Sequence, residues 1–143
     1  MKKSMIGMIG LLITLCVALP ASAANPDQVK RLLETGECSG CDLTQANLSG
    51  THLLGADLRS ANLEGANLTN ANLEGADLTG ANLRETNLTG AFMTNASLNL
   101  ADLSQANLAS VKMYNADTAG AVLTGINTQN AQLFGSGINV GGD

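Results

Sequence analysis

A five-residue alternation of apolar and polar positions runs along most of the chain. Residues 46–90 read ANLSG-THLLG-ADLRS-ANLEG-ANLTN-ANLEG-ADLTG-ANLRE-TNLTG. Each unit has a large apolar central residue, a small residue two places before it, and three residues that are polar or Gly. Steps of five from Leu43 to Ile138 give 20 centres, all Leu, Met or Ile except Thr118 and Thr128. A period of five fits neither an α-helix nor a plain strand. The pattern therefore predicts a solenoid that turns a corner every five residues and fills its narrow interior with one large and one small side chain per unit.

The repeated unit A(D/N)LXX, which covers residues 41–140, resembles the pentapeptide-repeat family. The resemblance implies an all-β fold, a right-handed quadrilateral β-helix with four units per coil and the central and small residues pointing inward. Twenty units make about five coils, which at the roughly 4.8 Å spacing of paired strands form a stack about 24 Å tall. Residues 20 apart are then vertical neighbours. We number the four faces of this solenoid by their first centres, which are Leu43, Leu48, Leu53 and Leu58.

A short amphipathic helix is predicted before the repeats. Asn25 is a favourable N-cap, Pro26 suits the first helical position, and Gln28 stands where a capping box places Gln or Glu. Gly36 is a natural terminator, so we expect the helix to run from Pro26 to about Thr35. Its apolar stripe consists of Val29, Leu32 and Leu33. Because two to three turns are marginal alone, this stripe should rest on the solenoid as a cap.

The first 23 residues have the pattern of a cleavable signal peptide. Lys2 and Lys3 precede an apolar run over 5–19, and 21–23 is the small-x-small sequence ASA. The run is shorter than the roughly 20 residues that span a bilayer, so we expect export without a permanent membrane anchor. The destination is the periplasm or the thylakoid lumen. The predicted organisation is a signal peptide over 1–23, a cap helix with a CxxC junction over 24–40, a solenoid over 41–140 and a tail over 141–143.

Composition argues against most enzyme classes and against nucleic-acid binding. Only 2% of the residues are aromatic and 13% are charged, there is one His, and the formal net charge is -5. Removal of the signal peptide takes away two Lys and no acid, which leaves about -7 and opposes an electrostatic grip on nucleic acid or an anionic membrane. No nucleophile with its base and no phosphate-binding Gly motif is visible. We expect a protein that is not an enzyme and that uses no cofactor and no metal.

Two carboxylates and two cysteines are the features that could nevertheless carry chemistry. Asp57 and Asp77 are vertical neighbours on the fourth face, where they could act as acid and base or hold a hard cation. Without a supporting cluster, a solvated surface is the preferred interpretation. Cys38 and Cys41 form C-S-G-C, but haem attachment would need His where Asp42 stands, and a zinc site lacks two further ligands. A structural disulfide is preferred over a thiol-disulfide redox site.

The start of the repeats adds a second resemblance. Over residues 25–48 the chain is similar to exported pentapeptide-repeat proteins of cyanobacteria and the chloroplast lumen, in which an N-terminal helix leads into a comparable CxxCDL sequence. This resemblance implies the same two compartments as the signal peptide.

The third face carries the main candidate for partner binding. Its predicted outward positions include the only His of the mature chain, all three of its aromatic residues, and several apolar or basic neighbours: His52, Leu54, Phe92, Lys112, Tyr114 and Phe134. Exposed aromatic clusters often mark interaction surfaces. We define the third-face patch as Phe92, Lys112, Tyr114 and Phe134, and predict that a protein docks there. Tyr114 and Phe134 should be close enough to stack. The alternative is that these aromatics only cover the last coils.

Three further features of the surface and core are predicted from the coil register. On the second face an unbroken Asn column, Asn47 to Asn127, should stack its amides along the axis. Glu64 and Arg84 should form an exposed ion pair on the first face. Thr118 replaces a large centre without compensation, so the fourth face near residues 116–118 should be the poorest-packed region.

The sequence thus supports three functional hypotheses. The leading one is an exported, non-enzymatic scaffold that binds an unidentified protein through one solenoid face, either as a monomer or as a homodimer. The second is a thiol-disulfide redox factor that uses Cys38 and Cys41. The third is a DNA-mimicking, topoisomerase-binding protein, as the gyrase-binding members of the family imply. The signal peptide opposes the third, since it would remove the protein from the cytoplasm.

Overall fold

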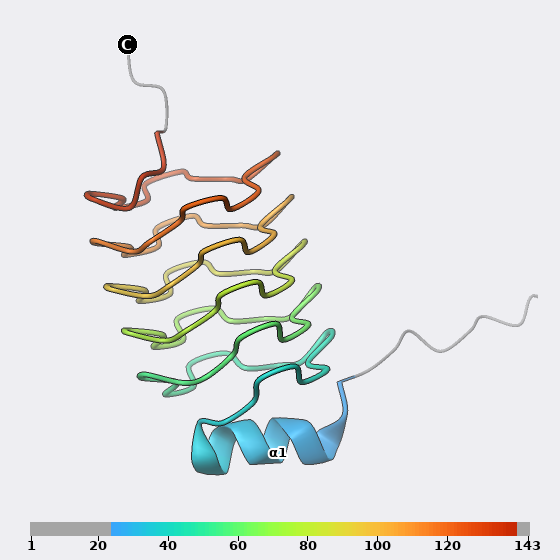
Figure 1. Ribbon diagram of the computed structural model, residues 1–143. Helices are drawn as coiled ribbons and strands as arrows, with labels where there is room; N and C mark the ends of the chain where they lie inside the picture. Colours follow the sequence, from blue (N-terminus) through green and yellow to red (C-terminus); the bar gives the residue numbers. More distant parts are fainter. Residues whose placement is uncertain (1–23, 140–143) are drawn as a thin grey trace, which may run out of the picture.

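The structure, a computed structural model, describes residues 24–139 as a stack of rectangular coils closed at one end by a single helix. The helix is α1, Pro26–Thr35, as the sequence predicts. In Figure 1, α1 lies across one end of the stack and the C-terminal coil forms the other end. The predicted signal peptide over 1–23 and the tail over 141–143 lie outside the described residues. Within 24–139, no helix is both long enough and apolar enough to cross a membrane.

Parallel β-bridges join each coil to the next and confirm that residues 20 apart are vertical neighbours. The bridged residue is always the one before a centre, and the bridges run from Glu37↔Asp57 to Lys112↔Gln132. Strand character is confined to these single bridged positions, so the structure contains no longer named strand in the described range. The bridge at Glu37 places Cys38 at a central position of the fourth face. The repeat register thus extends one unit before Leu43 toward α1.

Each corner of the solenoid is a tight turn that explains the polar or Gly residue at the end of the unit. The residue two places after the centre has a positive φ in every corner, for example 59° at Gln45, 66° at Gly50 and 56° at Asn70. The turn is closed by a hydrogen bond from the next small residue to the centre, as from Ala46 N–H to Leu43 C=O at 3.0 Å. Gly and Asn tolerate this left-handed conformation best. Leu100 adopts it too, with φ 59°.

The interior consists of the predicted central and small residues. From Leu43 to Met113 every centre is at most 2% exposed, and Met93 and Met113 are both fully buried. Where Thr86 replaces the small Ala, its hydroxyl is buried and donates to the carbonyl of Leu63 at 2.8 Å. This bond satisfies the polar group, so the substitution adds no unpaired atom to the core. In the last coil, Leu123, Ile126 and Leu133 are only half-buried, whereas Ser136 and Ile138 are buried.

The ends of α1 agree with the prediction. The side chain of Asn25 accepts a hydrogen bond from Asp27 N–H at 3.0 Å, and Pro26 occupies the first turn. Gly36 has φ 71° and donates its N–H to Leu32 C=O, which ends the helix. Asn25 and Gly36 therefore fix the helix length through capping, independently of its packing on the coils.

Two details of α1 differ from the prediction. Gln28 does not complete a capping box: its side-chain oxygen accepts from the N–H of Asp42, which ties the helix to the first coil. Leu33 is 51% exposed, whereas Leu32 is 1% exposed and Val29 packs on the core. The helix lies flat on the end of a narrow solenoid. The solenoid end is wide enough to cover Val29 and Leu32 but not Leu33.

Candidate functional site

The third face brings the four patch residues together on adjacent coils near the C-terminal end. Phe92 and Lys112 are bridged vertical neighbours, and the Lys112 ammonium lies 4.8 Å from the centroid of the Phe92 ring. This is a cation–π contact, which holds the Lys112 side chain against the face. Phe92 is half-buried, whereas Phe134 is 79% exposed. The most accessible aromatic surface is thus at Phe134.

Tyr114 lies between Phe92 and Phe134 along the stack. The N–H of Asn115 donates to the carbonyl of Phe134, which fixes the two aromatic residues in adjacent coils. The hydroxyl of Tyr114 donates to the side chain of Gln132. This bond orients the ring, which remains 36% exposed. The face therefore presents two accessible aromatic rings on a rigid backbone, with Lys112 beside them.

His52 and Leu54 occupy the same two outward columns but lie further toward α1. Bridges connect His52 to Asn72 and Asn72 to Phe92, so His52 is two coils away from the patch. Leu54 is 68% exposed in the first complete coil. The structure thus confirms that they share the face but separates them from the aromatic cluster.

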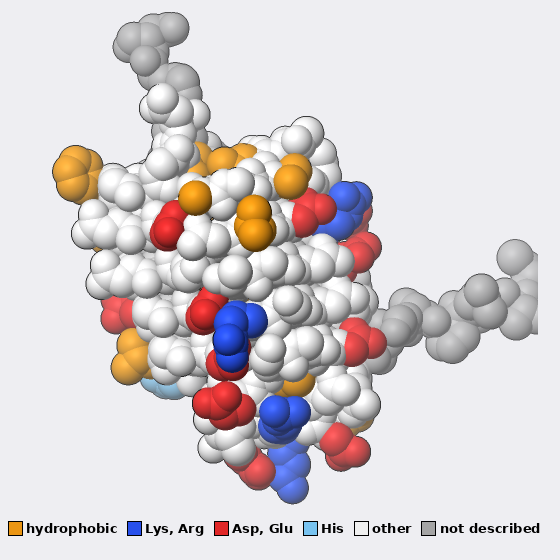
Figure 2. Space-filling model, viewed as in Figure 1, with side chains coloured by type: hydrophobic (Ala, Val, Ile, Leu, Met, Phe, Trp, Pro, Cys, Tyr) orange, Lys and Arg blue, Asp and Glu red, His pale blue; other side chains and the backbone are white. Residues whose placement is uncertain are grey.

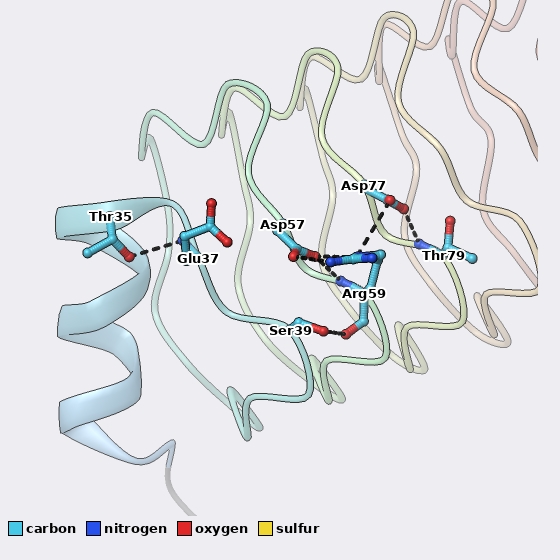
Figure 3. A network of polar contacts seen from close by, with 7 residues as sticks. All are labelled: Thr35, Glu37, Ser39, Asp57, Arg59, Asp77 and Thr79. Atoms are coloured by element: carbon cyan, nitrogen blue, oxygen red, sulfur yellow. Dashed lines mark hydrogen bonds and ion pairs between the residues drawn. The ribbon is translucent and has the colours of Figure 1, made fainter.

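On the fourth face, Arg59 lies between the two carboxylates singled out in the sequence (Figure 3). Its guanidinium is 2.6 Å from an Asp57 oxygen and 3.8 Å from an Asp77 oxygen. The hydrogen bonds from Arg59 lower the pKa of Asp57 to about 2, and the same contact raises the pKa of Arg59. The Asp57 carboxylate is thus held ionised beside a cation, and Asp77 shares the same guanidinium, an arrangement that suits neither a proton donor nor a metal ligand. Sequence reasoning missed Arg59, although its position two residues after Asp57 on the same face was the available signal.

The network of Figure 3 also links the first coil to α1. Ser39 donates its hydroxyl to the carbonyl of Arg59 at 3.1 Å, and the N–H of Glu37 donates to the Thr35 hydroxyl at the end of the helix. Through Ser39, Arg59 is joined to the segment that directly follows α1. Its role is structural, and it leaves the fourth face without a free acid–base pair at this point.

The predicted ion pair on the first face is wrong. Arg84 is 3.4 Å from Asp102, and Glu64 instead accepts a hydrogen bond from Asn82 at 3.1 Å. In both contacts the side chain that follows a centre meets the side chain 18 positions later. That second residue precedes the centre of the same face in the next coil. Side chains in these two places share one outward face and meet diagonally.

The Asn column of the second face is real but its amide stacking is interrupted. Asn67 donates to Asn47 at 3.4 Å, and Asn127 donates to Asn107 at 3.0 Å. Along the whole column the side-chain oxygen accepts the N–H two residues later, as from Thr89 to Asn87. The primary role of these Asn side chains is to brace the corner turns.

The two cysteines of the CxxC lie inside the wall of the first coil. Their sulfur atoms are 2.06 Å apart, at disulfide distance, with a Cα–Cα separation of 5.2 Å. Cys38 is 0% and Cys41 4% exposed, and Cys38 Sγ contacts the Gln28 carbonyl of α1 at 3.4 Å. The pair has little access to solvent, whereas a redox-active thiol needs to be reached by its substrate.

A surface hollow of about 410 Å³ lies on the fourth face of the last coils, where the sequence predicts poor packing. Its lining includes Ala116, Asp117 and Thr118 on one side and Gly135 to Gly137 on the other. One coil earlier on this face, the N–H of Leu98 donates to the carbonyl of Asp117. At Thr118 the side-chain hydroxyl instead donates to the Ser136 carbonyl at 2.6 Å. The side-chain amide of Asn99 donates to Asp117 and lowers its pKa.

Across the described residues, no three His, Cys, Asp or Glu side chains gather where they could hold a metal ion.

Comparison with solved structures places the chain beside two proteins of similar build. The first is Rfr23, a pentapeptide repeat protein from the cyanobacterium Cyanothece 51142, with 32% identity and a TM-score of 0.63 over 76% of this chain and 91% of that one. The second is a pentapeptide repeat protein from the thylakoid lumen of Arabidopsis thaliana, with 33% identity and a TM-score of 0.51 over 73% of this chain and 72% of that one. No match was found among curated proteins.

The family comparison covers residues 37–136, which is nearly all of the solenoid. Pentapeptide repeats, in eight-copy blocks, match residues 37–75, 66–105, 76–113 and 101–136. The first match begins at Glu37, where the structure has its first bridge. Together with the quadrilateral coil, these matches show that the chain belongs to the pentapeptide repeat family.

Proposed function

We propose that this protein is an exported, non-enzymatic scaffold that binds a protein partner through the third-face patch. The observation that carries the proposal is the combination of exposed aromatic surface at Phe134 and Tyr114 with a backbone ladder that holds both residues in register. Large aromatic side chains on rigid supports supply binding energy at a low cost in conformational entropy. Lys112, fixed over Phe92, adds one positive charge at the edge of the patch.

Export is part of the proposal. The pattern of residues 1–23 supports it, and a similar structure belongs to a thylakoid-lumen protein. The lumen and the periplasm remain the two compartments we propose. The buried Cys38–Cys41 pair suits a compartment that permits disulfides.

The two alternative functions receive less support from the side chains. A redox factor needs accessible sulfur, and both cysteines are buried. A DNA mimic needs a row of free negative charges, whereas Asp57 and Asp77 lie beside Arg59 and Asp102 lies beside Arg84. The neutralised acids interrupt the negative surface on two of the four faces.

Site-specific photocrosslinking in the native compartment tests the proposal. A photoreactive residue in place of Phe134 should give one dominant crosslinked protein band. The matched control is the same residue in place of Val122, an exposed apolar side chain of the same coil on the first face. A partner captured equally from both positions, or from neither, would contradict docking on the third face.

A further inference from the structure

The backbone ladder between the coils opens at one place on the fourth face. One coil lower, Leu98 donates its N–H to the Asp117 carbonyl at 2.7 Å, and Asp117 donates its N–H to the Ala96 carbonyl at 2.9 Å. The equivalent N–H groups of Thr118 and Gly137 have no hydrogen-bond acceptor within residues 24–139. On the other three faces, parallel bridges still join the last two coils. The opening is therefore local to the fourth face.

The hollow of about 410 Å³ on the fourth face lies at this opening. Thr118 lines one wall and Gly137 lines the other, and the Thr118 hydroxyl spans the gap to the Ser136 carbonyl at 2.6 Å. Since the N–H groups of the lower centres on this face point into the next coil, the N–H of Thr118 is directed into the gap. Backbone N–H groups are strong donors, so the two walls together offer a pair of them to a ligand.

The upper wall of the hollow is made of glycines, which keep it open. Gly135 and Gly137 have φ 74° and 75°, a conformation that other residues rarely adopt. A Cβ on Gly137 would come within 3.2 Å of Thr118 Oγ1, and a Cβ on Gly135 would collide with the side-chain oxygen of Asn115. Because neither position carries a side chain, a small molecule can reach the backbone groups of this wall. The volume lies within the roughly 300–1,000 Å³ of small-molecule sites.

The hollow has an acidic lining and no nearby basic residue in the sequence. The side-chain amide of Asn99 donates to the Asp117 carboxylate at 2.9 Å, and the Asn99 oxygen is buried without a partner in the described part of the chain. No Lys, Arg or His follows Lys112 in the sequence. In Figure 2 most Lys and Arg side chains lie toward α1, and the C-terminal end of the visible surface is mainly uncharged. A simple anion would therefore be repelled by Asp117, whereas a ligand with its own positive group would be attracted.

We propose that the fourth-face hollow binds a small molecule with a primary ammonium group one carbon away from a carboxylate or carbonyl, as in a free α-amino acid or at the N-terminus of a peptide. The Asp117 carboxylate accepts hydrogen bonds from the ammonium group, and the N–H groups of Thr118 and Gly137 donate to the ligand oxygens. This site goes beyond the third-face docking function, and either can fail without the other.

Amide NMR shifts of the mature protein, recorded during a titration with L-alanine, test the proposal. The signals of Thr118 and Gly137 should shift saturably below about 50 mM L-alanine, because both N–H groups gain an acceptor. L-Alaninamide keeps the ammonium group and a carbonyl but lacks the carboxylate, so it separates the two sources of this chemistry. Equal affinity for both compounds supports a peptide N-terminus as the ligand, and tighter binding of L-alanine supports a free amino acid.

Two half-ligands test whether both ends of the molecule are recognised. Acetate has only the carboxylate and methylammonium has only the ammonium group, so neither should give saturable shifts over the same range. If either one alone reproduced the shifts seen with L-alanine, the site would read a single charge and the proposal would be overturned.

A pair of matched variants tests the role of the carboxylate. Asp117→Asn should raise the dissociation constant of L-alanine at least about tenfold, because the charge-assisted hydrogen bond to the ammonium group is lost. The control is Asp77→Asn, at the equivalent position two coils lower, where the ladder is closed by the bond from Leu78 N–H to the Ser97 carbonyl. The control should bind L-alanine as the wild type does. Unchanged affinity in Asp117→Asn, or a wild-type protein whose Thr118 and Gly137 signals do not shift, would overturn the proposal.

Discussion

The disulfide pair Cys38 and Cys41 fills one central and one small position of the solenoid interior, where the repeat otherwise has Leu and Ala. Cys38 is in register with the fourth-face centres, because its neighbour Glu37 bridges to Asp57. The pair is thus a part of the first coil and contacts α1 through the Gln28 carbonyl. Its position explains why the CxxC directly follows the helix.

The first prediction separates a structural from a redox disulfide. Cys38→Leu with Cys41→Ala restores the repeat pattern and should lower the free energy of unfolding by no more than about 1.5 kcal/mol. Cys38→Ser with Cys41→Ser removes the same cross-link but also places two hydroxyls in the core, and should cost about 2–5 kcal/mol. Urea denaturation measures both. Equal losses, or loss of partner capture in a fully stable Leu–Ala variant, would favour the redox interpretation.

The second prediction concerns the inward and outward positions. Leu83 is fully buried, so Leu83→Ala should cost about 2–5 kcal/mol through the cavity it leaves. Thr94 is half-buried, points outward, and Thr94→Ala should change stability by no more than about 0.5 kcal/mol. Both changes lie in middle coils and are compared by urea denaturation. Similar losses from the two variants would contradict the assignment of the interior.

The third prediction concerns acid stability. Hydrogen bonds from Arg59 lower the pKa of Asp57 from 3.8 to about 2, so this interaction stabilises the fold above about pH 4 and is lost as the pH falls through about 2. Arg59→Ala should therefore reduce the urea midpoint at pH 7, and the difference from wild type should shrink between about pH 4 and 2. Lys30→Ala, in an exposed pair with Glu34, is the control. A difference that stays constant across this range would refute the linkage.

The fourth prediction concerns export. Cleavage after Ala23 should leave a mature protein that begins near Ala24. Intact-mass measurement and N-terminal sequencing of protein purified from its native source would show this directly. Recovery of the uncleaved chain from the cytoplasm would contradict export and would favour the DNA-mimic hypothesis.

Most of the fold could be predicted because the same five-residue unit, with its large centre, small residue and corner turn, is repeated along the chain. The period of five gives the corners, and the resemblance to the pentapeptide-repeat family implies four units per coil and so the 20-residue register that the bridges confirm. The helix bounds followed from Asn25, Pro26 and Gly36, whose effects are local. Leu33 could not be assigned correctly, because its exposure depends on how much surface the end of the solenoid offers to α1.

The side-chain contacts were harder to predict because they follow a different register from the backbone. Backbone pairing joins residues 20 apart, but several outward side chains meet 18 apart, as Tyr114 meets Gln132 and Thr79 meets Ser97. Glu64 and Arg84 were therefore paired incorrectly. The third-face patch was predicted because membership of a face depends only on the backbone register, whereas the contact of Lys112 with Phe92 depends on side-chain conformation.

The affinity of the crosslinked partner for a third-face variant tests the central claim most directly. Tyr114→Ser with Phe134→Ser should raise the dissociation constant at least about thirtyfold, as expected for the loss of aromatic hot spots, and should leave the melting temperature unchanged. The control, Leu100→Ser with Val122→Ser, removes two exposed apolar side chains outside the third face and should leave the affinity unchanged. Unchanged affinity in the third-face variant, or a loss that merely follows a lowered melting temperature, would contradict docking through Tyr114 and Phe134.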